Sequence, residues 1–204
     1  MTYWRPRVRQ ATIAAALILA IAAAAAQGSV QADAQSMREK LEFIVEFGER
    51  PQSRPAPPVR TAFTEDEINA YLAVYGETLL PSGIADPSIR IGEGGLVTAR
   101  AIVDLDAVRK SRQRAWRDPL AYATGSLEVV ASGFVSSADG VGVARVESVT
   151  LAGLGVPKGL LDELIQFYTA SPERPQGFGL DQPFELPADI RSVRLEPGRA
   201  TVTQ

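Results

Sequence analysis

The 204-residue sequence contains no cysteine and no histidine, and these two absences exclude several kinds of chemistry. Ser-His-Asp and Cys-His nucleophilic arrangements are impossible without them. Thiolate and imidazole metal sites are also excluded, and no disulfide can form. Carboxylates, lysines and serines remain, but no pairing combines a nucleophile, a base and an orienting group. The sequence therefore predicts no catalytic residue, metal site or cofactor, and the chain is not expected to be an enzyme.

The chain also lacks an apolar run of the usual membrane-spanning length. Residues 11–26 are uncharged, but these 16 residues fall short of the roughly 20 that a spanning helix needs. Arginines precede the run and small residues follow it, with Ala32-Asp33-Ala34 matching a cleavage site. The arginines are Arg5, Arg7 and Arg9. Residues 1–34 are thus predicted to be a cleaved signal peptide or, as the alternative, a retained membrane anchor. Either outcome predicts export to the periplasm or another extracytoplasmic space, at the outer surface of the cytoplasmic membrane.

An excess of positive charge is absent too. The formal net charge is -3, and removing residues 1–34 would make it more negative, because they hold three arginines and one aspartate. A chain with this charge does not attract phosphate backbones in general, so nucleic acid is not an expected partner.

Beyond the leader, periodic patterns divide the chain. Apolar residues at helical spacing predict an amphipathic helix over residues 35–50, and four prolines predict a stiff linker over 51–60. Residues 61–204 are then expected to form one sheet-and-helix domain. Its first helix should begin at the capping box of Thr64 and Glu67 and end at Gly76.

That helix has an aromatic stripe with Tyr71 and Tyr75, which is typical of a core face and equally suits the rim of a groove. A second helix is predicted over residues 158–169, where Leu161 and Ile165 belong to the apolar face.

A long hairpin within residues 122–156 is the centre of the predicted fold. Asp139-Gly140 supplies the positive φ angles of a tight turn. Apolar or small residues alternate with polar ones along the first strand, which predicts one buried and one wet face. The apolar set includes Leu127, Val129, Ala131 and Gly133.

Further strands are expected over residues 88–92, 96–108, 190–196 and 199–203, with Gly92–Gly95 as a hairpin turn. Asp104 and Asp106 would share a face of the second strand, where a solvated surface is favoured over an acid and base pair. The predicted fold class is α+β: a curved antiparallel sheet packed against two or three amphipathic helices, after an N-terminal signal or anchor helix.

Positive charge gathers in one segment, residues 109–117. Arg112, Arg114 and Trp116 favour a solvated loop, with contact to lipid headgroups or an anionic partner as the alternative. Lys158, near a predicted helix start that follows glycines, could hold a phosphate, although a structural turn is favoured.

The order of these segments resembles the exported bacterial LmeA-type and YpmS-like phospholipid-binding proteins, which are akin to the tubular lipid-binding and AsmA-like folds. The similar stretches include FTEDEINAYL, IVDLDAV, VTLAGLGVPKGLLDELI and ELPADIRSVRLEPGRATV, between Phe63 and Thr203. The resemblance implies a strongly curved antiparallel sheet with an apolar groove for acyl chains, and no catalytic residues. The proline-rich spacer and the short chain depart from that pattern.

Two functions follow as hypotheses. The first is an envelope protein that binds or passes a phospholipid or another acyl ligand in a groove between the sheet and its helices, where small residues could leave room. The ligand-binding residues would be Tyr71, Tyr75, Leu127, Val129, Ala131, Gly133, Leu161 and Ile165, and the headgroup or partner contacts Arg112, Arg114, Trp116 and Lys158. The alternative is a membrane-tethered structural or assembly factor that acts through protein partners.

Overall fold

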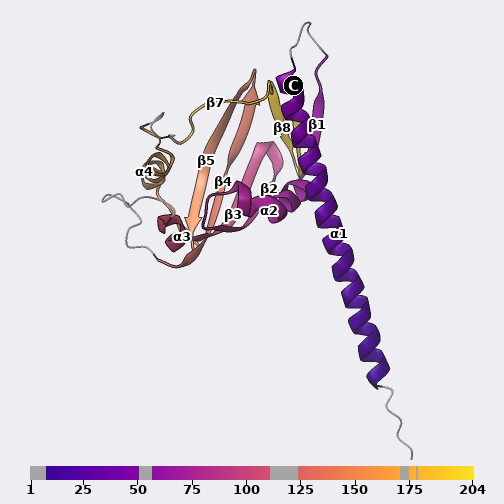
Figure 1. The fold of residues 1–204 in the computed structure, drawn as a ribbon. Coiled ribbons are helices and arrows are strands. Elements are labelled where there is room, and N and C mark those ends of the chain that lie inside the picture. Colours follow the sequence, from indigo (N-terminus) through magenta and orange to yellow (C-terminus); the bar gives the residue numbers. More distant parts are fainter. Residues whose placement is uncertain (1–7, 51–56, 111–123, 171–174, 178) are drawn as a thin grey trace, which may run out of the picture.

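The computed structural model describes residues 8–50, 57–110, 124–170, 175–177 and 179–204, with the side chains of the first helix described from Gly28 onward. Across these residues the fold is α+β, with four α-helices and two antiparallel sheets (Figure 1). The predicted α+β class is confirmed. The helices are α1 (Val8–Glu49), α2 (Glu65–Leu79), α3 (Leu105–Lys110) and α4 (Lys158–Thr169).

The larger sheet has the strand order β2-β3-β4-β5-β6, and β7 also pairs with β5. Each pair is antiparallel. The central pair, β4 and β5, forms the predicted long hairpin, in which Asp139 (φ 51°) and Gly140 (φ 80°) make the tight turn. The strands are β2 (Ile84–Ile91), β3 (Leu96–Asp104), β4 (Ser126–Ala138), β5 (Val141–Leu151), β6 (Leu154–Gly155) and β7 (Phe184–Glu185).

A second sheet has three strands in the order β1-β9-β8, and β8 packs against β4 of the larger sheet. Its strands are β1 (Arg60–Thr64), β8 (Ser192–Glu196) and β9 (Arg199–Thr203). The predicted closing hairpin across Pro197-Gly198 is confirmed, whereas β1 was not predicted. Arg60 belongs to β1 and so shortens the predicted linker of residues 51–60, of which 51–56 lie outside the described residues.

The best-buried apolar cluster joins α1 to this small sheet. Ile44, Phe63 and Val202 are its centre, and Met37, Leu41 and Ile68 are among the residues that pack around them. The Gln204 amide donates hydrogen bonds to the carbonyl oxygens of Ile44 and Ala188, at 2.8 and 2.6 Å. We call residues 28–49 of α1, together with α2, β1, β8 and β9, the packed module.

Several element boundaries differ from the prediction. The helix expected over residues 35–50 is the C-terminal part of α1, which begins at Val8. Helix α2 continues through Gly76 to Leu79, and the N–H of the C-cap residue Leu80 donates to the Gly76 carbonyl at 2.8 Å. In the part of the chain whose side chains are described, no helix has both the length and the hydropathy to cross a membrane.

The strand predicted over residues 96–108 ends at Asp104, and this boundary is a correction. An Asp104 carboxylate oxygen accepts hydrogen bonds from the backbone N–H groups of Asp106 and Ala107, at 2.9 and 3.0 Å. Such an N-cap begins a helix, so the chain turns into α3 here. Asp106 accepts from the Gly125 N–H at 2.9 Å. The two carboxylates thus hold the backbone at this corner and do not share the face of a strand.

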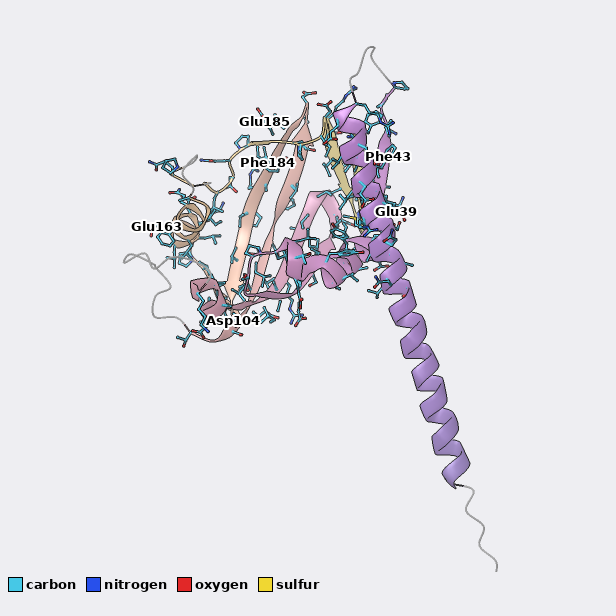
Figure 2. All side chains as sticks on the ribbon, in the orientation of Figure 1. Glu39, Phe43, Asp104, Glu163, Phe184 and Glu185 are labelled. Carbon is cyan, nitrogen blue, oxygen red and sulfur yellow. The ribbon has the colours of Figure 1, made fainter. Side chains whose placement is uncertain are left out.

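The larger sheet has two distinct ends. The turn end carries Asp139 and Gly140, and the α3 end carries α3, Gly125 and the tight turn between β5 and β6. Figure 2 labels Asp104 at the α3 end and Phe184 toward the turn end.

Candidate functional site

One face of the larger sheet is apolar over most of its length, and we call it the apolar face. Directly paired residues in an antiparallel sheet point to the same side, so the register identifies its members. In the two central pairings, Ala99 is opposite Ala131, and Ala131 is opposite Val149. The apolar face comprises Ile84, Ile89, Ile91, Val97, Ala99, Ala101, Val103, Leu127, Val129, Ala131, Gly133, Val135, Ala144, Val146, Val149 and Leu151.

The opposite face is mostly polar. Arg100 pairs with Glu128 across β3 and β4, and Thr98 lies 3.0 Å from Ser132 between their hydroxyl oxygens. Both pairs point away from the apolar face, because they stand at the alternate positions of the same strands. The large sheet therefore has the one-sided pattern of an antiparallel sheet that faces water on one side and something apolar on the other.

The apolar face is only partly covered. Ile91 and Val149 are buried, but most of its other residues are half-buried and Ala99 is exposed. Strand β8 covers the turn end, where the Ser137 hydroxyl bonds to the backbone of Val193 at 2.6 and 3.1 Å. Among the described residues, those in the middle of the face and at its α3 end are mostly half-buried or exposed.

Helix α2 lies along the edge of the sheet and does not cross this face. The Asn69 side chain accepts a hydrogen bond from the N–H of Ile89 and donates one to its carbonyl, at 2.7 and 2.8 Å. One turn earlier, Glu65 accepts from the N–H of Ile91 at 2.8 Å. These side chains stand in for a neighbouring strand and close the free edge of β2, which would otherwise be available to another chain. Helix α2 is thus a wall beside the apolar face.

The structure brings four of the predicted ligand-binding residues together. Leu127, Val129, Ala131 and Gly133 share the apolar face, as their alternation predicted. The backbone also favours glycine at position 133, because β5 bulges opposite it. Ser132 pairs with Ser148, but Gly133 pairs with Val146, so β5 has one extra residue here. A Cβ at position 133 would overlap the Arg145 carbonyl and lie 3.1 Å from the Val146 Cα.

The other four predicted ligand-binding residues lie elsewhere. Tyr71 and Tyr75 pack on each other with ring centroids 5.0 Å apart, and the Arg38 guanidinium lies over the Tyr75 ring at 6.0 Å. This pair therefore faces α1 and not the apolar face. Leu161 and Ile165 are half-buried on α4, which lies beyond β5, on the opposite side of the larger sheet from α1 and α2 (Figure 1).

Two aspartates attach α4 to the sheet through the segment that follows it. Asp162 accepts a hydrogen bond from the Leu180 N–H, and Asp181 from the Val146 N–H on β5, both at 2.8 Å. The bond from Val146, followed by the contact with Lys158, lowers the pKa of Asp181. Lys158 lies 3.2 Å from Asp181, so this predicted headgroup contact has an internal partner. Arg112, Arg114 and Trp116 lie outside the described residues.

A buried charge in the packed module was not predicted. Glu67 accepts from the Ser36 hydroxyl at 2.6 Å, from the Lys40 ammonium at 2.5 and 2.7 Å, and from the Thr64 N–H at 2.9 Å. Burial alone would raise the pKa of Glu67, but the hydrogen bonds from Lys40, Ser36 and Thr64 outweigh it and lower that pKa to about 2. The capping box indicated Glu67, yet nothing local indicated that α1 supplies its cation. This site holds α1 in place.

The described residues contain no group of three or more acidic side chains arranged to hold a metal ion. Searches against protein-family models, curated proteins and solved structures give no match for this chain.

Proposed function

We propose that this chain is an exported protein, tethered to the outer surface of the cytoplasmic membrane by residues 11–26, that holds lipid acyl chains against its apolar face. The observation that carries the proposal is the exposure of that face: Ala99 is exposed at its centre, and the residues around it are only half-buried. Water against this surface is unfavourable, and an acyl chain would gain about 0.8 kcal/mol for each CH₂ group that it buries.

Three features support a lipid as the occupant. The face is a broad, shallow surface of aliphatic side chains without a polar group at its centre, which suits a flexible chain and offers no directional contact. Retained as the membrane anchor, the apolar run of residues 11–26 would keep the domain next to a bilayer. The resemblance to exported phospholipid-binding proteins implies the same ligand class.

The test is lipid extraction from the full-length protein, purified from membranes in mild detergent, followed by mass spectrometry and by titration with a fluorescent fatty acid. Ala99→Phe places a ring on the open part of the face and should weaken fatty-acid binding about tenfold, which corresponds to roughly 1.4 kcal/mol. Ala138→Phe is the matched control, because Ala138 is an exposed alanine of the same sheet on its polar face.

Equal binding by both variants and the unaltered chain, or the absence of co-purifying lipid, would overturn the proposal. A stoichiometric protein partner in place of lipid would favour the structural or assembly factor instead.

A further inference from the structure

The tight turn between β5 and β6 is apolar and is exposed from Ala152 to Gly155. Leu151 pairs with Leu154 across Ala152 (φ 49°) and Gly153 (φ 80°). No residue from Leu151 to Val156 carries a charge. Leu154, at 75%, is the most exposed of the large hydrophobic side chains described, and Ala152, Gly153 and Gly155 around it are exposed too. The turn therefore presents one large aliphatic side chain, without a neighbouring charge in the turn, to whatever lies beyond this end of the sheet.

Helix α1 shows which way this turn faces. Near its C-terminus, α1 bonds to Gln204 through the Ile44 carbonyl, and Gln204 also bonds to Ala188. The neighbouring Arg191 carbonyl accepts from the Gly140 N–H at 2.8 Å, so this part of α1 lies at the turn end of the large sheet. Lys40 and Ser36, about one and two turns earlier than Ile44, reach Glu67 at the start of α2. Following α1 toward Val8 therefore leads past the α3 end of the sheet, as Figure 1 shows.

This direction places the α3 end beside the membrane. A helix rises 1.5 Å per residue, so Ala34, the first buried residue described on α1, lies about 12 Å from Ala26, where the apolar run ends. The polar layer of each leaflet is roughly 5–8 Å thick. With residues 11–26 in the hydrocarbon core, the α3 end is the part of the domain nearest to the headgroups.

The charges at this end agree with that placement. The carboxylates of Asp104 and Asp106 accept hydrogen bonds from backbone N–H groups, whereas Lys110 is exposed at the end of α3. An exposed lysine at the same end of the sheet as an aliphatic turn suits an anionic lipid surface, because the ammonium can reach headgroups while the turn meets the acyl region.

From these observations we propose that the Leu151–Leu154 turn dips into the outer leaflet and that lipid reaches the apolar face from there. The inference rests on the proposed function and adds the route of entry. Leu127, Val129 and Leu151 stand on the apolar face next to the turn, so an acyl chain leaving the leaflet beside Leu154 would meet apolar surface directly.

The absence of cysteine from the chain makes a direct test possible. Leu154→Cys and Ala138→Cys place a single environment-sensitive fluorophore in exposed positions at opposite ends of the larger sheet. Ala20→Cys reports on the apolar run itself. Each full-length labelled protein is reconstituted into vesicles of phosphatidylcholine and phosphatidylglycerol, and quenching by a lipid-borne nitroxide is compared with quenching by aqueous iodide.

We expect the labels at positions 20 and 154 to emit at shorter wavelength and to be quenched by the nitroxide, and the label at position 138 to be quenched by iodide alone. A label at 154 that responds only to iodide, or one at 138 that responds to the nitroxide, would overturn the inference. So would an aqueous response at position 20. If the label at position 154 responds only to iodide while Ala99→Phe still weakens fatty-acid binding, only the route of entry is wrong. If the label at 154 is quenched by the nitroxide while Ala99→Phe leaves fatty-acid binding unchanged, the proposed function is wrong and the membrane contact remains.

Discussion

The packed module and the larger sheet use apolar residues in opposite ways. In the module, Phe63 is 3% and Ile44 4% exposed, because side chains of α1, α2 and β8 pack around them. On the apolar face of the larger sheet, Leu127 and Val129 are only half-buried and Ala99 is exposed. The same chain thus builds a closed core in one region and leaves a comparable apolar surface open in the other. The difference indicates that the module supplies stability, and the open sheet is the basis of the proposed lipid binding.

The largest expected effect sharpens this comparison directly. Phe63→Ala removes a ring from the closed cluster and should lower the free energy of unfolding by about 3–5 kcal/mol. Leu127→Ala, on the open face, should cost about 1 kcal/mol, because its side chain is already partly in contact with water. Urea denaturation followed by circular dichroism measures both. Equal losses would contradict the division between the two regions.

The second prediction concerns the charge that holds α1 to the module. Glu67→Gln leaves Lys40 without its carboxylate and should cost about 2 kcal/mol, whereas Glu42→Gln, in an exposed pair with Arg38, should cost less than about 0.5 kcal/mol.

The pH dependence follows from the same site. Because the folded-state pKa of Glu67 is lowered to about 2 from 4.5, its contribution is complete above about pH 4.5 and is lost as the pH falls toward 2. Denaturation curves recorded across this range should show that loss in the natural chain and a smaller one in Glu67→Gln. Identical acid profiles would mean that the ion pair contributes nothing to docking of α1.

The third prediction separates the bulge in β5 from space for a ligand. Gly133→Ala should cost about 1–3 kcal/mol, because its Cβ would overlap the Arg145 carbonyl. Gly155→Ala, where a Cβ would meet no atom within 4 Å, should be neutral or slightly stabilising. Thermal melts of the two variants give the comparison. A fully stable Gly133→Ala protein would mean that the bulge adapts and that position 133 offers free space after all.

The smallest effect is expected at the closed edge of the sheet. Asn69→Ala removes both side-chain hydrogen bonds to Ile89 and should cost about 1 kcal/mol, while freeing the β2 edge for pairing with a second molecule. Amide hydrogen exchange at Ile89 and sedimentation velocity report the two consequences. Asn69→Asp, which keeps the acceptor for the Ile89 N–H, should show less exchange than Asn69→Ala. Unchanged exchange in both would contradict the role given to α2.

Features that depend on neighbouring residues were predicted well from the sequence. Asp139-Gly140 defines its turn locally, Thr64 and Glu67 define a capping box, and Pro197-Gly198 joins the closing hairpin. The alternation through Leu127, Val129 and Ala131 likewise identified one face of β4.

Features that depend on distant partners were not predicted. The pairing of β1 with β9 joins residues at opposite ends of the domain, and no local pattern in Arg60–Thr64 indicates it. Asp104 continued the alternation of β3 but caps α3 instead, because its carboxylate bonds forward along the chain. Tyr71 and Tyr75 lie on a helix whose two sides both have partners, so the spacing could not show that they face α1.

The most direct measurement of the central claim is photo-crosslinking with a phospholipid that carries a diazirine in its acyl chain, followed by peptide mapping of the adducts. An acyl chain held on the apolar face predicts adducts at Ala99, Ala101 and Ala131, and none at their outward-facing neighbours Arg100 and Ser132. Adducts spread equally over both faces, or found only in the packed module, would contradict the account.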